Sequence, residues 1–212
     1  MATRFQEAMF RELPVVGILR GFDTSVVERL ARASIEGGLR NLEITMNSQG
    51  AEETIRMAVH HFEGRCNVGA GTVVTMDDLE RALSAGAGFI VTPVVVPDVI
   101  RECVARGVPV MPGALTPTEV WEAWRLGADL VKIFPADQLG PAHIKALKGP
   151  FPKIPLMPTG GVTVETLPGF RKAGADAFGV GGPLFDATRA EAEDWEWFRE
   201  QARRFVQAYQ QS

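Results

Sequence analysis

The sequence predicts an α/β fold, a single (β/α)8 TIM barrel that takes in residues 1–212 as one domain. Two observations predict it. Short apolar runs alternate with amphipathic stretches such as TMDDLERALSAG and TPTEVWEAWRLG. Glycines also recur every 20 to 27 residues, a length that accommodates one strand, one helix and two short loops. A chain of 212 residues can bury a substantial core in one domain.

The recurring glycines are expected to end helices, because glycine tolerates the left-handed conformation that follows a last helical turn. Seven such points separate eight strand–helix units. These glycines are Gly37, Gly64, Gly86, Gly107, Gly127, Gly149 and Gly174.

The eight expected strands are mainly apolar rather than alternating, which is typical of parallel strands that are covered on both faces. The alternative architecture is an open doubly wound sheet, but no G-x-G-x-x-G follows the first strand. The expected strands occupy residues 14–20, 40–46, 66–71, 88–92, 108–111, 130–134, 154–158 and 176–180.

The composition argues against several classes of partner. The formal net charge is -4, and the 22 Lys and Arg residues are scattered, so we expect no nucleic acid partner. No apolar run approaches the length of a membrane span, and the N-terminus lacks a continuous apolar signal segment, so we expect a cytoplasmic protein without membrane contact. Neither the two cysteines nor the three histidines show metal-ligand spacing, so we expect reduced thiols and no metal.

Polar residues at the C-terminal ends of the expected strands are the candidates for the active site, because active sites of such barrels are built at those ends. The candidates at these ends are Arg20, Glu43, Thr72, Thr92, Pro93, Lys132 and Thr159.

Lys132 lies among apolar neighbours in VKIFP, inside a strand expected to be buried. Burial disfavours the ammonium form and favours a neutral amine that can attack a ketone. The alternative is a structural lysine, either paired with a carboxylate or extending from a strand end to solvent. Glu43 in NLEITM is likewise a charged residue in a strand expected to be buried. The alternative to a catalytic role is that it forms a buried ion pair with a lysine or an arginine.

Together, a buried lysine and a buried glutamate on different strands of one barrel supply what imine chemistry needs. The lysine is the nucleophile, and the carboxyl group moves protons as the carbinolamine loses water and the enamine forms. Lys132 and Glu43 as a pair therefore favour catalytic roles, although neither residue alone carries this prediction.

Two glycine-rich segments follow the last two expected strands. PTGGVT contains Gly160 and Gly161, and GVGGPLF contains Gly181 and Gly182. Backbone N–H groups of such loops bind phosphate in many barrels. The alternative is that these glycines only make tight turns. GAGT at 69–72 is weaker evidence, because Thr72 could simply be a helix N-cap.

The chain resembles the family of 2-keto-3-deoxy-6-phosphogluconate and 2-keto-3-deoxy-6-phosphogalactonate aldolases over nearly its whole length. The motifs that carry the resemblance are GILRG at 17–21, LEITMNS at 42–48, GAGTV at 69–73, VTP at 91–93, PG at 112–113, KIFPA at 132–136, IKALKGP at 144–150, PTGGV at 158–162 and GVGG at 179–182.

The resemblance implies cleavage of a phosphorylated keto acid to pyruvate and glyceraldehyde 3-phosphate by a class I aldolase. It implies a homotrimer without a cofactor, Lys132 as the Schiff-base lysine and Glu43 as the general acid and base. The matched substrate-binding positions are Pro93 in VTP, Thr72 near the pyruvyl carboxylate, Thr159 near the substrate hydroxyls, Phe134 beside the imine, and Gly160, Gly161, Gly181 and Gly182 at the phosphate.

Departures from the motifs concern the sugar acid. Asn47 stands where gluconate-type members have an arginine, and Arg20 in LRG matches galactonate-type members, so Arg20 is expected to bind the carboxylate. In contrast, Thr159 in PTGG is gluconate-like, and Pro183 replaces a serine. We expect the galactonate epimer. The gluconate epimer and 4-hydroxy-2-oxoglutarate are the alternatives, and a binding barrel or a phosphate-binding isomerase is disfavoured by the intact Lys132 and Glu43.

Overall fold

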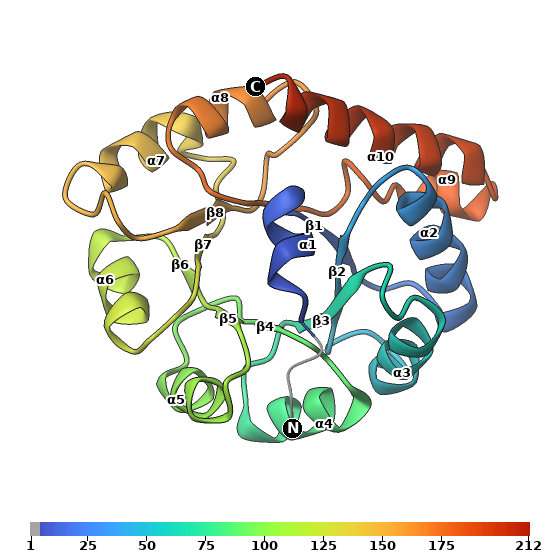
Figure 1. Cartoon of the computed structure of the whole chain (residues 1–212), viewed down its shortest axis with the longest axis horizontal. Coiled ribbons are helices and arrows are strands. Elements are labelled where there is room, and N and C mark those ends of the chain that lie inside the picture. The colour runs from blue at the N-terminus through green and yellow to red at the C-terminus, as the bar shows by residue number, and fades with distance from the viewer. Residues whose placement is uncertain (1–4) are drawn as a thin grey trace.

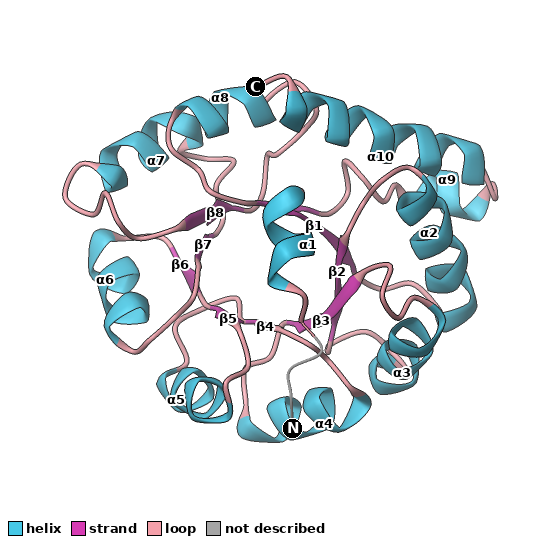
Figure 2. Ribbon diagram, in the orientation of Figure 1, coloured by secondary structure: helices cyan, strands magenta, loops and turns pink. Residues whose placement is uncertain are grey.

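The computed structural model describes residues 5–212, so residues 1–4 of the expected domain lie outside the described part. A ring of short parallel strands forms the centre, and helices surround it (Figures 1 and 2). The expected (β/α)8 barrel is confirmed. Its strands are β1 (Val15–Leu19), β2 (Asn41–Thr45), β3 (Asn67–Gly71), β4 (Ile90–Val91), β5 (Val110–Met111), β6 (Gly113–Ala114), β7 (Val131–Ile133), β8 (Leu156–Pro158) and β9 (Phe178–Val180).

The nine strand segments correspond to the eight expected strands, because β5 and β6 are one strand interrupted at Pro112. The expected end of this strand at residue 111 was wrong, since the strand resumes as Gly113–Ala114. Proline has no N–H group to donate to the ladder. The order β5-β4-β3-β2-β1-β9 continues the sequence of neighbours around the ring, and β6-β7-β8 completes it. A bridge between Thr159 and Gly179 joins β8 to β9, so the ring closes.

The outer layer consists of helices that follow the strands. The helices are α2 (Thr24–Glu36), α3 (Ala51–His61), α4 (Met76–Ala85), α5 (Pro97–Arg106), α6 (Pro117–Arg125), α7 (Gly140–Lys148), α8 (Leu167–Lys172), α9 (Ala187–Glu191) and α10 (Trp195–Gln210). Among the described residues, no helix combines the length and the apolar character that a bilayer span requires.

Five of the seven expected C-terminal glycines adopt the left-handed conformation, with φ between +65° and +101°: Gly64, Gly86, Gly107, Gly127 and Gly174. Gly37 and Gly149 also end their helices as expected, but the expected left-handed conformation was wrong for them, since their φ values are -73° and -57°. At the end of α2 the left-handed residue is Gly38 instead, with φ +106°. Gly37 serves close packing, since a Cβ there would lie 2.3 Å from the Arg199 carbonyl oxygen of α10. After Gly149 the turn stays right-handed, and the Phe151 N–H bonds the Leu147 carbonyl.

A short helix before β1, α1 (Glu7–Glu12), was not predicted from the sequence. It lies across the centre of the ring in Figure 1. Phe10 of this helix packs against the interior core and lies with Pro14, Pro109 and Pro155, which precede strands, so α1 covers the N-terminal face of the barrel. The Asn67 side chain accepts a hydrogen bond from the Gln6 N–H and donates to the Gln6 carbonyl, which attaches this segment to the start of β3. The opposite face, where the strands end, is thereby left as the open end of the barrel.

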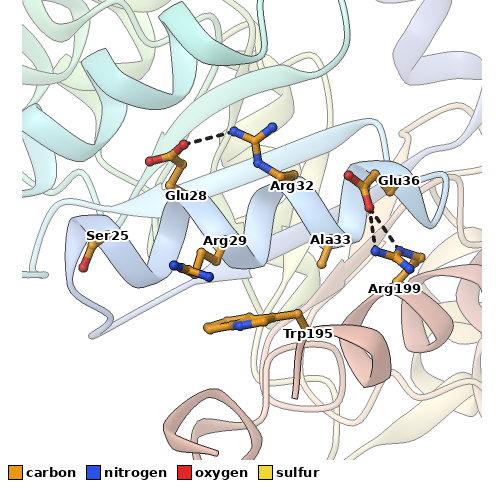
Figure 3. Close-up of a pocket in the computed structure, with 8 residues that line it drawn as sticks. All are labelled: Ser25, Glu28, Arg29, Arg32, Ala33, Glu36, Trp195 and Arg199. Carbon is orange, nitrogen blue, oxygen red and sulfur yellow. Dashed lines mark hydrogen bonds and ion pairs between the residues drawn. The ribbon is translucent and has the colours of Figure 1, made fainter. Parts of the chain in front are cut away.

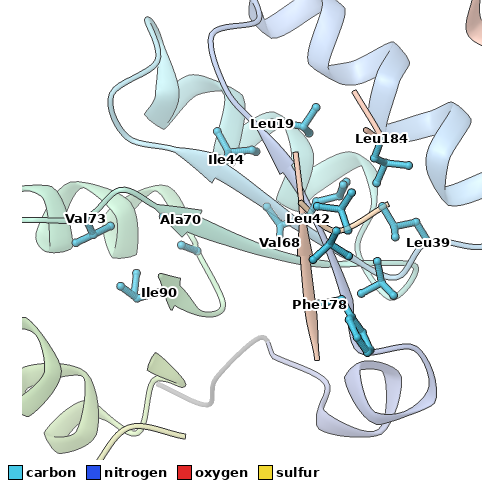
Figure 4. Packing of buried hydrophobic residues seen from close by; sticks show 14 of the residues in the cluster. Leu19, Leu39, Leu42, Ile44, Val68, Ala70, Val73, Ile90, Phe178 and Leu184 are labelled. Atoms are coloured by element: carbon cyan, nitrogen blue, oxygen red, sulfur yellow. The ribbon is translucent and has the colours of Figure 1, made fainter. Parts of the chain in front are cut away.

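The apolar core has two parts. The larger part lies between the ring and the helices and includes Leu42, Val68 and Phe178 (Figure 4). The smaller part fills the inside of the ring. Its members are Val16, Phe89, Val91, Met111, Leu130, Met157 and Ala177, with Phe5 and Phe10 packed against them. Any side chain that faces the interior is therefore closed off from solvent on the N-terminal side.

Candidate active site

Lys132 faces the interior of the barrel. It is the middle residue of β7 and pairs with Gly113 on one side and Met157 on the other. Aligned residues of neighbouring parallel strands point to the same face of a sheet, and Met157 belongs to the interior core. The Lys132 side chain is accordingly buried, with 3% of the residue exposed.

The buried lysine has no carboxylate partner in residues 5–212. Of the lysines in this range, only Lys148 forms an ion pair, with Asp176 at 2.7 Å. The Lys132 Nζ atom lies over the Phe134 ring, 5.2 Å from the ring centroid. A structural role for Lys132 as half of an ion pair therefore finds no support in the described part of the chain.

Glu43 is buried completely and faces the same interior. It pairs with Gly69, and a Cβ on Gly69 would lie 2.5 Å from the ring of Phe89, a member of the interior core. Both carboxyl oxygens are buried without a hydrogen-bond partner among residues 5–212. Because an unpartnered buried polar group is costly, such a group is a mark of a functional site.

Glycines make the space that these polar side chains occupy. A Cβ on Gly71 would lie 1.7 Å from Oε1 of Glu43, so β3 must carry glycine where it passes the carboxyl group. On β9, a Cβ on Gly179 would lie 2.2 Å from Oγ1 of Thr159. The Thr159 hydroxyl is also buried and unpartnered within the described residues. Glu43 and Thr159 therefore bring buried, unpartnered oxygen atoms to the inside of the barrel, and Lys132 brings an amine that has no carboxylate partner in residues 5–212.

Arg20 and Thr72 meet at the mouth. Arg20 follows β1, Thr72 follows β3, and the Arg20 Nη2 atom lies 3.4 Å from Oγ1 of Thr72. Thr72 has a left-handed backbone with φ +57°, and the N-cap of α4 is Thr75. The interpretation of Thr72 as an N-cap was therefore wrong. Asn47 is exposed in the turn after β2.

Pro93 and Phe134 border the opening from two other strands. Pro93 follows β4 and is half-buried, and its carbonyl oxygen would lie 2.2 Å from a Cβ on Gly113 of β6. Phe134 follows β7 directly after Ile133 and is 38% exposed. Thr92, a strand-end candidate, instead turns its hydroxyl to the Val94 carbonyl within its own loop.

The four glycines of the expected phosphate loops lie after the adjacent strands β8 and β9. Gly160 and Gly161 have φ values of +96° and +69°, and a Cβ on Gly161 would lie 2.9 Å from Asp137. Turn geometry and close packing therefore already require glycine there. Gly181 and Gly182 differ, since no atom lies within 4 Å of a Cβ placed on either. Their surroundings are open.

Sequence reasoning missed the glycines that line the interior, Gly71, Gly113 and Gly179. The local sequence carries no signal for them, because their inward position follows from strand register: each lies on the same side of the sheet as Lys132 or Glu43. Sequence reasoning also missed Ser48, whose Oγ atom accepts a hydrogen bond of 2.9 Å from the Gly21 N–H. Residues 5–212 contain no group of three or more His, Cys, Asp and Glu side chains placed to hold a metal ion.

A hollow lies outside the barrel, between α2 and α10, with a volume of about 490 Å³ (Figure 3). Among the residues that line it, Arg32 forms an ion pair with Glu28, and Arg199 forms one with Glu36. Trp195 packs under the Arg29 guanidinium, 5.6 Å from the ring centroid. This hollow contains none of the predicted site residues, which gather at the open end of the ring.

The chain has relatives of known name and structure. The family model described as KDPG and KHG aldolase matches residues 6–200. The 2-dehydro-3-deoxy-6-phosphogalactonate aldolase of Escherichia coli strain K12 is 36% identical over 202 residues, covering 95% of this chain and 97% of the relative. The 2-dehydro-3-deoxy-phosphogluconate aldolase of Treponema pallidum strain Nichols is 39% identical over 158 residues, covering 74% and 73%.

A solved structure described as native KDPGal superposes with a TM-score of 0.88 at 36% identity, covering 94% of this chain and 95% of that one. The match extends over the strands that carry Glu43 and Lys132, since it takes in nearly the whole barrel. Named relatives of both the galactonate and the gluconate type are similar to the chain. The chain therefore belongs to the KDPG and KHG aldolase family and is an aldolase, a carbon–carbon lyase.

Proposed function

We propose that this aldolase cleaves a 2-keto-3-deoxy-6-phospho sugar acid to pyruvate and glyceraldehyde 3-phosphate through a Schiff base on Lys132. One observation carries the proposal. A buried lysine and a buried glutamate, neither with an ionic partner among residues 5–212, face the inside of the same barrel. An amine and a carboxyl group are the nucleophile and the proton carrier that this reaction requires.

The Lys132 amine attacks the C2 carbonyl carbon of the substrate, and a proton moves to the former carbonyl oxygen to give a carbinolamine. The Glu43 carboxyl group supplies the proton with which that hydroxyl leaves as water, and a protonated imine remains. The imine nitrogen then accepts the electron pair of the C3–C4 bond as the C4 hydroxyl loses its proton to the Glu43 carboxylate. Glyceraldehyde 3-phosphate leaves, and an enamine stays on Lys132.

The same carboxyl group returns its proton to C3 of the enamine, which restores the imine. Water adds to the imine carbon and gives a proton to the Glu43 carboxylate, and the resulting carbinolamine breaks down to pyruvate and the free amine as its hydroxyl proton passes to the nitrogen. Because Glu43 has no competing hydrogen-bond partner in the described residues, it is available at each proton transfer. The proton count balances, since each proton that Glu43 takes up is given back within one cycle.

The binding groups have separate tasks in this proposal. Arg20 binds the carboxylate, with Thr72 beside it at the mouth. Thr159 donates to a substrate hydroxyl, which would satisfy its unpartnered Oγ1 atom. Gly181 and Gly182 receive the phosphate in open space after β9.

The galactonate epimer is proposed as the main substrate, because Asn47 occupies the position of the gluconate-type arginine and Arg20 takes the carboxylate from the β1 side. The test is the ratio of kcat/KM for the two C4-epimeric 6-phospho acids, followed by pyruvate release. A ratio in favour of the galactonate compound supports the proposal, and a ratio far in favour of the gluconate compound rejects it. Turnover of 4-hydroxy-2-oxoglutarate, which lacks the phosphate, should be much slower on either view.

A homotrimer is proposed as the assembly. Large apolar side chains are exposed in the segments after β3, β4 and β6, where Val74 is 43%, Val94 55% and Trp121 51% exposed. Apolar surface of this kind suits contact with a second copy. Light scattering coupled to gel filtration should give three times the chain mass of 23.0 kDa. A monomeric mass at micromolar concentration would refute the proposal.

A further inference from the structure

Arg20 is flanked by two backbone groups that are hydrogen-bonded to the neighbouring strand. On one side, the Leu19 carbonyl accepts a hydrogen bond of 3.4 Å from the Thr45 hydroxyl. On the other side, the Gly21 N–H donates a hydrogen bond of 2.9 Å to Oγ of Ser48. Thr45 ends β2 and Ser48 lies in the turn that follows it. The chain is therefore held on both sides of Arg20.

The two hydroxyl groups also bond to each other, at 2.8 Å, and the partners fix the direction of every proton. A carbonyl only accepts and an N–H only donates. Thr45 therefore gives its proton to Leu19, Ser48 gives its proton to Thr45, and Ser48 accepts from Gly21. We call this chain of three hydrogen bonds the Thr45–Ser48 clasp. Without the Ser48 hydroxyl, the Gly21 N–H loses its partner and the chain is broken.

The turn held by the clasp has little else to restrain it. Gly21 is exposed and has a φ of +75°, a conformation that residues with side chains rarely adopt. No atom lies within 4 Å of a Cβ placed on Gly21. Packing therefore does not fix the backbone on that side, and the Ser48 hydrogen bond does.

The direction of the Arg20 side chain depends on this backbone. The guanidinium reaches Thr72 after β3, although Arg20 itself follows β1. Since β2 lies between β1 and β3, the side chain crosses the end of the strand that carries Glu43. A rotation of the backbone at Arg20 would swing the guanidinium away from this place.

We propose that Ser48, acting through Thr45 and Gly21, is a positioning residue that holds Arg20 over the barrel mouth for the substrate carboxylate. The inference rests on the proposed function, in which Arg20 binds that carboxylate. Ser48 needs no contact with substrate. Its hydroxyl instead lowers the number of orientations that Arg20 samples before binding, and a preorganised group binds more tightly.

Pyruvate is the probe, because it carries the carboxylate and the ketone without the sugar or the phosphate. Reductive trapping with cyanoborohydride is followed against pyruvate concentration, which yields a half-saturating concentration and a limiting rate. In Ser48→Ala we expect the half-saturating concentration to rise about fivefold, as suits the loss of one neutral hydrogen bond. The limiting rate should stay within about twofold, because Lys132 and Glu43 are not moved.

Three further variants make the test specific. Ser48→Thr keeps the hydroxyl and should restore the wild-type half-saturating concentration. Thr45→Val removes the donor to Leu19 and should reproduce the effect of Ser48→Ala. Ser25→Ala removes an exposed hydroxyl on α2 and should change nothing. If Ser48→Ala does not fold, Thr45→Val carries the test.

The double variant Arg20→Ala, Ser48→Ala identifies the route of action. If Ser48 acts through Arg20, its substitution has no further effect once the guanidinium is gone. An unchanged half-saturating concentration in both Ser48→Ala and Thr45→Val overturns the inference, and so does a full fivefold effect in the Arg20→Ala background. If the wild-type chain forms no adduct at any pyruvate concentration, the proposed function itself fails, and this inference with it.

Discussion

A Cβ atom on Gly71 would lie 1.7 Å from Oε1 of Glu43, so the glycine of β3 and the carboxyl group of β2 occupy one space. Gly71→Ala is therefore expected to displace Glu43 and to lower kcat by at least about a hundredfold, the contribution of a well-placed acid–base group. The measurement is steady-state turnover with circular dichroism as the check on folding. Gly169→Ala is the control, because a Cβ there meets only Pro141 at 3.5 Å. Turnover within twofold of wild type in Gly71→Ala would contradict this account.

Glu43→Gln separates the chemistry of Glu43 from its effect on stability. The amide cannot carry the proton, so kcat should fall by about 10²- to 10⁴-fold. The free energy of unfolding should not fall, because both carboxyl oxygens of Glu43 are buried without a partner and a neutral side chain of the same shape is less costly to bury. Thermal unfolding should show an equal or higher Tm. Glu53→Gln, on the exposed face of α3, is the control for both readouts. A clear drop in Tm would mean that the Glu43 carboxylate has a stabilising partner.

The capping box of α6 gives the chain a pH-dependent stability. The carboxylate of Glu119 accepts hydrogen bonds from the N–H groups of Thr116 and Leu115 and from the Thr116 hydroxyl, which lowers its pKa from the ordinary 4.5. A pKa that is lower in the folded than in the unfolded chain stabilises the fold above the unfolded value, and this contribution is lost as the pH falls through the folded value.

Glu119→Gln should therefore lower the free energy of unfolding by about 0.5 kcal/mol at pH 7, a discounted value for an exposed helix N-terminus. The difference should be smaller at an acidic pH below 4.5, because the wild-type carboxylate loses its charge as the pH falls through the lowered pKa of the folded chain. Urea unfolding at several pH values measures it, with Glu12→Gln on α1 as control. A difference that is the same at both pH values would contradict the charge-based origin.

The two cysteines are expected to be unreactive in the folded chain. Burial raises the pKa of Cys103 to about 12 and raises the pKa of Cys66 as well. Since the thiolate is the reactive form, neither side chain should react with iodoacetamide at about pH 8. Both should be alkylated in guanidinium chloride, as mass spectrometry can count. Rapid labelling of either cysteine under native conditions would show that its surroundings open.

The eight strands could be predicted because each is a short apolar run followed by an amphipathic stretch, and every observed strand segment except β6 lies within its expected range. The position of α1 could not. None of its residues is buried, and it is held by Asn67, a residue far away in sequence. Gly37 and Gly149 show the limit of the glycine rule, since one glycine serves helix packing and the other a right-handed turn.

For the site, charge in apolar strands made Lys132 and Glu43 candidates, and their pairing, the glycine-rich loops and the family resemblance favoured catalytic roles over structural ones. That both face the same interior depends on strand register, which the sequence pattern only implies. The space beside Glu43 and the Thr45–Ser48 clasp depend on contacts between neighbouring strands. Such contacts have no local signature, because glycine and serine are ordinary residues in turns.

Borohydride trapping with pyruvate tests the central claim most directly. We expect the intact mass to rise by one reduced pyruvyl group and the modified peptide to map to Lys132. Lys132→Ala should remain folded and form no adduct, whereas Lys145→Ala, at an exposed position on α7, should be trapped like the wild type. No adduct in the wild-type chain, or an adduct on another lysine, would contradict the proposed Schiff base.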